Sequence, residues 1–258
     1  MALVDVIVVS YNNHDELRAC VEELAFVDWV NVIVTDNESS DGTLDAVRDL
    51  PIDAVASGWN GGFAFGVNRG WRRGSAPYVL LLNPDARIEP DSLRRLVDAL
   101  ELDARAAIAA PRITEPGGEL DFSQRRFPRL RSTYAEALFL HRFFPRASWS
   151  DEMMRDVSAY AEDGSPDWVS GACMLIRRTV LEDLGGLDED FFMYGEDKDF
   201  CRRARDTGYT IRFVAGSTCI HVGGASTPSR AAAAMLARSR RRYAAKHHRG
   251  RRALLERL

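Results

Sequence analysis

Strand-like apolar runs alternate with helix-like segments through the first 110 residues, and no other feature constrains the fold as strongly. The β-branched run LVDVIVV at residues 3–9 is followed by a polar turn and a predicted helix at residues 15–25. The remaining strands are predicted at residues 31–35, 54–56, 78–82 and 107–110, with helices at 41–50, 63–73 and 90–102. This alternation predicts right-handed crossovers and a mainly parallel sheet with helices on both faces, whose ligands bind at the carboxyl ends of the strands.

Residues 111–167 interrupt the pattern with turn residues, clustered aromatic and arginine side chains, and an apolar run at Phe139–Phe144. We interpret this segment as an insertion. Regular elements return as a strand at 169–177, helices at 178–184 and 196–207, and a strand at 210–214. The prediction is one α/β domain over residues 1–228, with a nucleotide-binding half (1–110) and an acceptor-side half (111–228), followed by a basic helical tail (229–258).

The composition is that of an ordinary globular protein, with 46% hydrophobic and 28% charged residues among 258. The sequence has no apolar run long enough to span a bilayer, and its first residues lack the basic and apolar segments of a signal peptide. We therefore expect a cytoplasmic protein. The four cysteines are widely spaced without a CxxC pair, which favours buried, reduced thiols over a zinc site or a disulfide framework.

Charge is distributed unevenly along the chain. From Arg230 onward ten Arg or Lys residues stand against the single acidic Glu256, whereas the net charge of the whole chain is −4. A basic, alanine-rich helix can rest peripherally on anionic lipid at the inner face of the plasma membrane, or it can be a solvated terminal helix. Both interpretations stay open, and no nucleic-acid partner is predicted.

Polar residues follow the first two predicted strands. Ser10 and Tyr11 come directly after the first strand, and Asp36 follows the second. A carboxylate at a strand end can accept hydrogen bonds from a ribose or from the imide N–H of a pyrimidine base. Asp41, slightly further along, is more typical of a helix N-cap.

Two further turns are candidates for holding a diphosphate. Asn60-Gly61-Gly62 precedes a predicted helix, where free amides can bind phosphate, although such a turn can also be only a turn. Asn83-Pro84-Asp85 ends the strand at 78–82, and a carboxylate there suits a Mg²⁺ or Mn²⁺ ion that bridges two phosphates; the alternative is a Pro-Asp turn. His221 is a candidate further ligand, or a structural hydrogen-bonding group.

Glu196 and Asp197 open the helix predicted at 196–207, directly after the aromatic loop Phe191–Tyr194. Carboxylates are favourable in the first turn of a helix, so capping alone would explain them. Aromatic side chains beside them can stack on a sugar and raise the pKa of a neighbouring carboxylate towards the range of a general base.

Taken in order, these pieces form a specific series. It comprises Val9-Ser10-Tyr11-Asn12, Asp36-Asn37, Asn60-Gly61-Gly62-Phe63-Ala64, Asn83-Pro84-Asp85-Ala86, Ser170-Gly171-Ala172, Gly186-Leu187-Asp188-Glu189, Glu196-Asp197 and His221 with the following Gly223-Gly224. The series resembles glycosyltransferase family 2, and within it the rhamnosyltransferase-like branch that acts in cell-wall and polysaccharide assembly. The resemblance covers about residues 4–226 and implies a GT-A fold.

The resemblance also implies a role for each matching residue. Asp36 would hold the base or ribose of the donor, with Ser10 and Tyr11 lining the pocket and Asn60, Gly61 and Gly62 packing against ribose and diphosphate. Asp85 would ligate the metal with His221, whereas Asn83 replaces the first aspartate of the family's DxD motif and would contact the donor. Asp197 matches the catalytic base and Glu196 its companion. Arg126, in Gln124-Arg125-Arg126-Phe127-Pro128, is a candidate phosphate contact for donor or lipid acceptor.

The reaction implied is an inverting sugar transfer that needs Mn²⁺ or Mg²⁺. The donor is expected to be dTDP-L-rhamnose, with a UDP sugar as the alternative, and the acceptor a glycan or a lipid-linked sugar. A nucleotidyltransferase is a rival from another class, but its glycine- and lysine-rich phosphate loop is missing where Ser10-Tyr11-Asn12-Asn13 stands. A silent sugar-nucleotide or glycan-binding protein is a third candidate, and it is disfavoured because Asp85, Glu196, Asp197 and His221 are all present.

Overall fold

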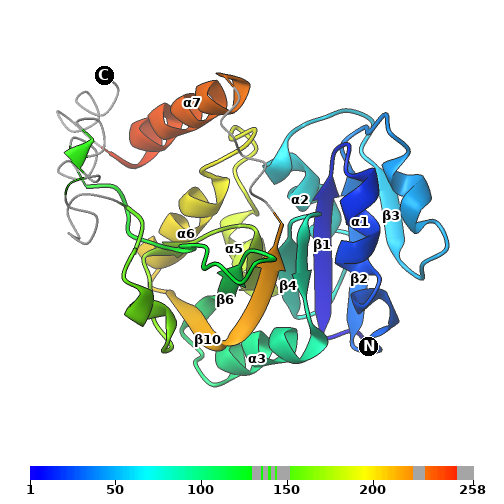
Figure 1. Cartoon of the computed structure of the whole chain (residues 1–258), viewed down its shortest axis with the longest axis horizontal. Coiled ribbons are helices and arrows are strands. Elements are labelled where there is room, and N and C mark those ends of the chain that lie inside the picture. The colour runs from blue at the N-terminus through cyan, green and yellow to red at the C-terminus, as the bar shows by residue number, and fades with distance from the viewer. Residues whose placement is uncertain (130–134, 136–138, 141–142, 144–151, 223–229, 249–258) are drawn as a thin grey trace.

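The computed structural model describes residues 1–129, 135, 139–140, 143, 152–222 and 230–248, and these form a sheet with helices on both faces (Figure 1). The elements of the first half are β1 (Val4–Ser10), α1 (His14–Val21), η1 (Leu24–Phe26), β2 (Val30–Asp36), η2 (Thr43–Val47), β3 (Asp53–Ala56), α2 (Phe63–Trp71), β4 (Tyr78–Leu82), β5 (Ala86–Ile88) and α3 (Pro90–Glu101). The second half contributes β6 (Ala106–Thr114), β7 (Gln124–Arg125), η4 (Val157–Tyr160), β8 (Trp168–Val169), β9 (Cys173–Arg177), α5 (Arg178–Leu184), α6 (Glu196–Asp206), β10 (Thr210–His221) and α7 (Arg230–His247).

The main sheet has eight strands in the order β3-β2-β1-β4-β9-β6-β10-β5, and β7 and β8 form a separate antiparallel pair. The strands β3, β2, β1 and β4 run parallel, as the alternating pattern predicts, and β6 runs parallel to β10. β9 is antiparallel to β4 and β6, and β5 is antiparallel to β10. The sheet is therefore mixed in its second half, because the chain inserts β9 between two strands that it had already formed.

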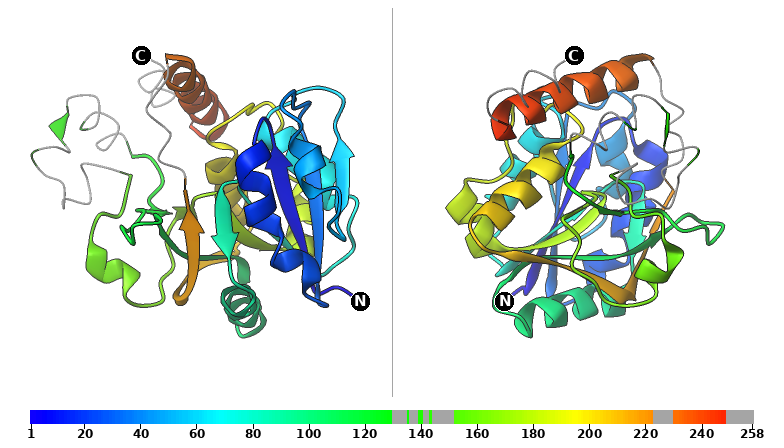
Figure 2. Two further views of the ribbon diagram at one scale, coloured as in Figure 1. Left: turned by 45° about the vertical axis from the view of Figure 1, so that its right-hand side comes forward. Right: turned by 90° about the vertical axis from the view of Figure 1, so that its left-hand side faces the viewer.

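Each face of the sheet buries its own apolar layer. Helices α1 and α3 pack on one face, where their apolar residues meet alternate residues of β1, β2 and β4. Helices α2, α5 and α6 pack on the other face, against the residues in between. The two turned views show these layers on either side of the strands (Figure 2). Alternation of side chains along a strand explains how one run such as β1 can be buried on both faces.

Several predicted elements differ in the structure. The helix predicted at 41–50 is only the short 3-10 helix η2, because the side chain of Asp41 accepts bonds from the backbone N–H and hydroxyl of Thr43 and fixes a turn there. The strand predicted at 169–177 is divided into β8 and β9 by the loop of residues 170–172. β5 and β7 are not predicted, since both are very short. Most of the Phe139–Phe144 run lies outside the described residues, and so does the glycine pair after His221.

Within the basic tail, the residues Arg230–His247 form the helix α7, which lies on the body of the protein (Figure 1). Tyr243 and Ala244 are only 1% and 3% exposed, so one side of this helix is buried against the rest of the protein. Within the described part of the chain, no helix has both the length and the apolar character needed to cross a membrane. All four cysteines are buried and free, as predicted from their spacing.

Candidate active site

Asp36 lies at the carboxyl end of β2, beside the end of β1. The register pairs Ser10 with Asp36, and the hydroxyl of Ser10 donates to Asp36 Oδ1 at 2.9 Å. Ser39 donates to the same carboxylate through its backbone N–H, 2.8 Å from Oδ2, and through its hydroxyl. Three donors thus hold an almost completely buried carboxylate in one orientation, which suits recognition of a ligand. Tyr11, next in sequence to Ser10, is exposed at the rim.

The glycine turn before α2 is in contact with the aromatic loop of the second half. Gly62 has φ +87°, and a Cβ at that position would lie 2.1 Å from the carbonyl oxygen of Phe192. The backbone N–H of Phe63 donates to that oxygen at 2.9 Å, and the N–H of Gly62 donates to the side chain of Asn60 at 3.1 Å. Two of the amides expected to face a phosphate therefore have partners inside the protein. The turn joins the two halves of the site.

Asp85 and His221 meet at one edge of the sheet, although 136 positions separate them. β5 pairs with the end of β10, which places His221 opposite Ala86, the residue after Asp85. The distance from Asp85 Oδ1 to His221 Nε2 is 3.1 Å. Adjacent ligands about 2.1 Å from a six-coordinate ion lie about 3 Å apart, so this pair fits one divalent cation. The described residues contain no cluster of three or more His, Cys, Asp or Glu side chains that could hold a metal ion.

A further carboxylate orients His221 from its other side. Asp121 Oδ2 lies 4.0 Å from His221 Nδ1, an arrangement typical of the residue that fixes a metal-binding imidazole. Asp121 and Asp85 together raise the pKa of His221 to about 10. The imidazole must therefore lose a proton before Nε2 can ligate a cation. The side-chain amide nitrogen of Asn83 lies 3.3 Å from His221 Nε2, so Asn83 lies beside the Asp85–His221 pair.

Glu196 and Asp197 begin α6, directly after the aromatic loop. Asp197 Oδ2 accepts a hydrogen bond from the backbone N–H of Gly171 at 3.0 Å. Glu196 is 6% exposed, and its buried Oε2 has no hydrogen-bond partner within the described residues. Burial and the neighbouring charge of Asp197 raise the pKa of Glu196 to about 8. Glu196 therefore keeps its proton at neutral pH, and the two carboxyl groups differ in what they can do.

Asp197 and the Asn83–Asp85 motif are hydrogen-bonded to adjacent residues of one loop. Gly171 donates to Asp197, and the carbonyl oxygen of its neighbour Ala172 accepts a hydrogen bond from the backbone N–H of Asn83 at 2.9 Å. A Cβ on Gly171 would lie 3.3 Å from the Cβ of Asp197, so the approach is close. The Ser170-Gly171-Ala172 segment thus brings the Asn83–Asp85 motif and the Glu196–Asp197 pair together.

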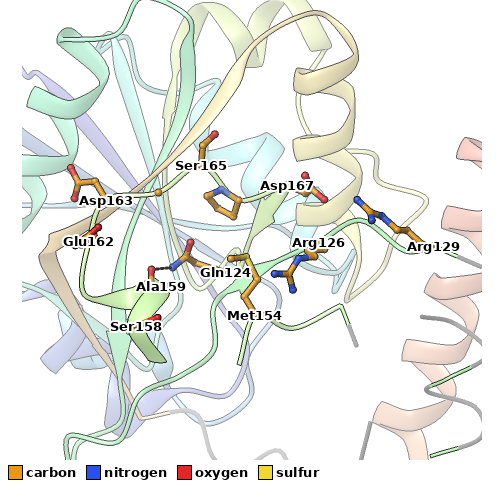
Figure 3. Close-up of a pocket in the computed structure, with 12 residues that line it drawn as sticks. Gln124, Arg126, Arg129, Met154, Ser158, Ala159, Glu162, Asp163, Ser165 and Asp167 are labelled. Atoms are coloured by element: carbon orange, nitrogen blue, oxygen red, sulfur yellow. Dashed lines mark hydrogen bonds between the residues drawn. The ribbon is translucent and has the colours of Figure 1, made fainter. Parts of the chain in front are cut away.

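Arg126 lies elsewhere. It lines a cavity of about 500 Å³ formed by the segments 124–129 and 158–167, with Arg129 on the same side and Asp163 on the opposite side (Figure 3). None of the other predicted site residues lines this cavity. The structure therefore places Arg126 apart from the other predicted site residues.

The sequence did not single out Asp121, Ser39 or Lys198. Asp121 lies in the segment interpreted as an insertion, and only the turn at residues 115–118, which brings Leu120 opposite Thr114, could have indicated its place. Lys198 is 7% exposed, and its ammonium group lies 4.6 Å from the ring of Tyr243 and 5.5 Å from that of Trp168. A lysine so deeply buried is held by aromatic faces that no local pattern reveals.

Residues 2–245 match the model of the family described as glycosyltransferase like family 2. The chain belongs to this family. Membership makes it a glycosyltransferase of family 2 type and an enzyme, as the ordered motifs predicted, and the match extends into α7, beyond the range that the motifs cover.

Named relatives support the rhamnosyltransferase-like branch. The chain is 31% identical over 237 residues to the N-acetylglucosaminyl-diphospho-decaprenol L-rhamnosyltransferase of Mycobacterium tuberculosis, covering 86% of this chain and 76% of that protein. It is 27% identical over 231 residues to the rhamnosyltransferase WbbL of Escherichia coli, covering 85% and 83%. The predicted branch is confirmed.

A solved structure supports the GT-A fold. The mannosyltransferase PcManGT of Pyrobaculum calidifontis, in complex with GDP-Man and Mn²⁺, matches with a TM-score of 0.58 at 21% identity. The match covers 94% of this family 2 chain but 61% of the mannosyltransferase, so the chain spans about three fifths of the length of that protein. The fold class is confirmed by this likeness.

Proposed function

We propose that this family 2 glycosyltransferase moves L-rhamnose from dTDP-L-rhamnose to a hydroxyl group of a glycan or a lipid-linked sugar, with inversion, in cell-wall or polysaccharide assembly. The support is the naming of two relatives as rhamnosyltransferases, one of them for a diphospho-decaprenol acceptor. The observation that carries the proposal is the loop of Gly171 and Ala172, which joins the proposed base Asp197 to the proposed metal motif at Asn83.

The donor nucleotide would occupy the ends of β1 and β2. Asp36, held by Ser10 and Ser39, would accept the imide N–H of a pyrimidine or a ribose hydroxyl. Tyr11 is exposed and can cover the base, while Asn60, Gly61 and Gly62 would lie along ribose and diphosphate. Asn83 would contact the donor beside the metal, since its amide lies next to His221.

Asp85 and His221 would hold a divalent cation, Mn²⁺ or Mg²⁺. The pair offers one carboxylate oxygen and one imidazole nitrogen, and this mixed set suits Mn²⁺ better than Mg²⁺, which prefers oxygen ligands only. When bound, the ion would neutralise the negative charge that grows on the leaving diphosphate. Asp121 would keep the imidazole ring in its ligating orientation.

Asp197 would accept the proton of the acceptor hydroxyl as that oxygen attacks the anomeric carbon from the side opposite the diphosphate. Its carboxylate is oriented by the backbone N–H of Gly171. Glu196, protonated at neutral pH because its pKa is about 8, is unsuited to take a proton and would shape the site instead. Arg126 and Arg129 would bind a phosphate group of the acceptor in their own cavity, outside the donor site.

The first test is a donor panel. The protein is incubated with dTDP-L-rhamnose, UDP sugars and GDP-mannose, each with Mn²⁺, Mg²⁺ or EDTA, and thermal shift and nucleoside diphosphate release are measured. We expect dTDP-L-rhamnose with Mn²⁺ to give the largest shift and slow release of dTDP. If the protein prefers a UDP sugar, the donor assignment is wrong but the proposed sugar transfer stands. If turnover in EDTA equals that with Mn²⁺, the reaction does not need the metal.

We further propose that α7 contacts anionic lipid at the cytoplasmic face of a membrane. Arg238 and Arg241 are exposed on the side of α7 that faces away from the protein. Basic side chains near an anionic surface each contribute about 1 kcal/mol to binding. Sedimentation with vesicles of phosphatidylglycerol and phosphatidylcholine, compared with phosphatidylcholine alone, tests this. Equal binding to both vesicles, or no loss of binding in the double variant Arg238→Glu, Arg241→Glu, would contradict it.

A further inference from the structure

The helix α7 is attached to the loop that precedes the catalytic carboxylates. From here on, the name aromatic loop is used for residues 188–195, which include the aromatic segment Phe191–Tyr194. Arg242 forms ion pairs with Asp190 and, at 3.7 Å, with Asp188. Lys246 Nζ lies 2.7 Å from Asp188 Oδ2, and the hydroxyl of Ser239 donates to the carbonyl oxygen of Met193 at 2.8 Å. One face of α7 therefore holds both ends of the loop.

A second set of contacts fastens α7 to α6. Asp199 is fully buried, and its Oδ1 lies 2.6 Å from His247 Nε2 and 2.8 Å from Lys246 Nζ. Its other oxygen forms an ion pair with Arg203 at 2.8 Å. Burial alone would raise the pKa of Asp199, but the bonds from His247 and Lys246 and the charge of Arg203 lower it to about 2. The helix is thus fixed to α6 independently of its contacts with the loop.

The end of the aromatic loop has a strained backbone. Tyr194 adopts a left-handed conformation with φ 68°, which non-glycine residues rarely do, and Gly195 follows with φ +90°. Such conformations persist only where the surroundings hold them. Ser239 provides that support, because it bonds to Met193, and its Cβ lies 3.6 Å from where a Cβ on Gly195 would be. Glu196 and Asp197 follow immediately.

The other side of the loop rests on the donor half. The carbonyl oxygen of Phe192 accepts the N–H of Phe63, and no side chain fits at Gly62 because that oxygen is so close. The side chains of Phe192, Met193 and Tyr194 are 42%, 37% and 36% exposed and free to meet a substrate. The loop therefore touches the donor turn and the base-bearing helix, while α7 supports it from outside.

We propose that α7 is a positioning element that fixes the aromatic loop as a preformed surface for the acceptor sugar, with Arg242 and Ser239 as positioning residues. The proposal rests on the proposed function in assigning the acceptor to this loop. Neither residue contacts the reacting atoms. Their loss leaves the donor site of Asp36 and Asp85 intact and loosens the surface on which the acceptor binds.

The test uses two arginines that each form an exposed or partly exposed ion pair. Arg242→Ala removes the loop contacts, whereas Arg94→Ala removes the ion pair with Asp98 on α3, away from the loop. We expect Arg242→Ala to raise the acceptor KM about two- to fivefold, as expected for the loss of a partly exposed ion pair, with donor KM unchanged. Ser239→Ala should act in the same direction, and Arg242→Lys should restore most of the acceptor affinity.

Hydrogen exchange of the full chain supplies a readout that does not need activity. In Arg242→Ala the amides of residues 188–195 should exchange faster than in the wild type, while those of α2 and β1 keep their rates, and in Arg94→Ala residues 188–195 should exchange as in the wild type. If both variants exchange alike and have the same acceptor KM, α7 does not position the loop. If Arg242→Ala exchanges faster but the wild-type protein transfers no sugar, the support of the loop by α7 stands and the proposed function is overturned instead.

Discussion

The two halves of the site are built in different ways. In residues 1–110 the predicted site residues lie at or just after the ends of their strands: Ser10 ends β1, Asp36 ends β2 and Asp85 comes three positions after β4. In residues 111–258 the contributing residues come together only through distant contacts, such as His221 with Asp85 and Arg242 with the aromatic loop. The donor site is therefore a local property of the βα repeat, and the catalytic and acceptor parts depend on the completed fold.

The largest effect is expected at the residue that the second half contributes to the chemistry. Asp197→Asn should lower turnover by about 10²- to 10⁴-fold, because an amide cannot accept the proton of the acceptor hydroxyl. Donor affinity, measured by calorimetry, should stay near that of the wild type, since Asp36 and Asp85 are untouched. Asp206→Asn, at the exposed end of the same helix, is the matched control. Full turnover in Asp197→Asn would exclude it as the base.

A second variant tests whether the second half of the chain contributes to binding of the metal ion. His221→Ala should lower activity at limiting Mn²⁺ by about 10- to 100-fold and lower the thermal shift that Mn²⁺ produces, because Asp85 is left as a single ligand. His14→Ala, an exposed histidine of the first half, should change neither quantity. An unaltered Mn²⁺ titration in His221→Ala would show that the first half binds the ion by itself.

The contact between the halves can be tested through two glycines. Gly62 and Gly58 both have positive φ, at +87° and +83°, but only Gly62 meets Phe192, and a Cβ at Gly58 has nothing within 4 Å. Gly58→Ala should cost about 1 kcal/mol in free energy of unfolding from backbone strain, and Gly62→Ala about 2–4 kcal/mol because strain and overpacking add. Urea denaturation measures both. Equal losses of unfolding free energy in the two variants would mean that the backbone at Phe192 accommodates the added methyl group without cost.

The last test is a pH dependence. Because the pKa of Glu196 is raised to about 8 in the folded protein, the folded state retains a proton that the unfolded chain releases above about pH 4.5. This contribution to stability is present below pH 4.5 and is lost as the pH rises towards 8. Glu196→Gln cannot titrate, so its melting temperature relative to the wild type should increase from pH 5 to pH 8. A constant difference over that range would contradict the raised pKa.

Much of the fold could be predicted because its signals are local. β4 and α5 have the predicted boundaries, since apolar runs and the turn residues around them specify both. The ordered series of motifs predicts that Asp36, Asp85, Asp197 and His221 belong to one site. Their roles in donor binding, metal binding and catalysis remain predictions.

The remaining features could not be predicted because they depend on residues far apart in the chain. Asp121 orients His221 across 100 positions, and Asp5, buried in β1, forms an ion pair with Arg178 at 2.5 Å. The tail helix could not be placed from its composition, because the partners of its basic residues are the acidic residues 188, 190 and 199 of the body. Arg126 matched a motif but lies in a separate cavity.

The pairing of β10 with β5 has a consequence for synthesis of the protein. During translation Asp85 leaves the ribosome more than 130 residues ahead of its partner, and β5 is an edge strand that pairs with the end of β10. Domains assembled from such distant pairings fold late. On the proposed function, the nascent chain cannot transfer sugar before His221 has emerged and joined Asp85, although the nucleotide pocket of β1 and β2 can form earlier.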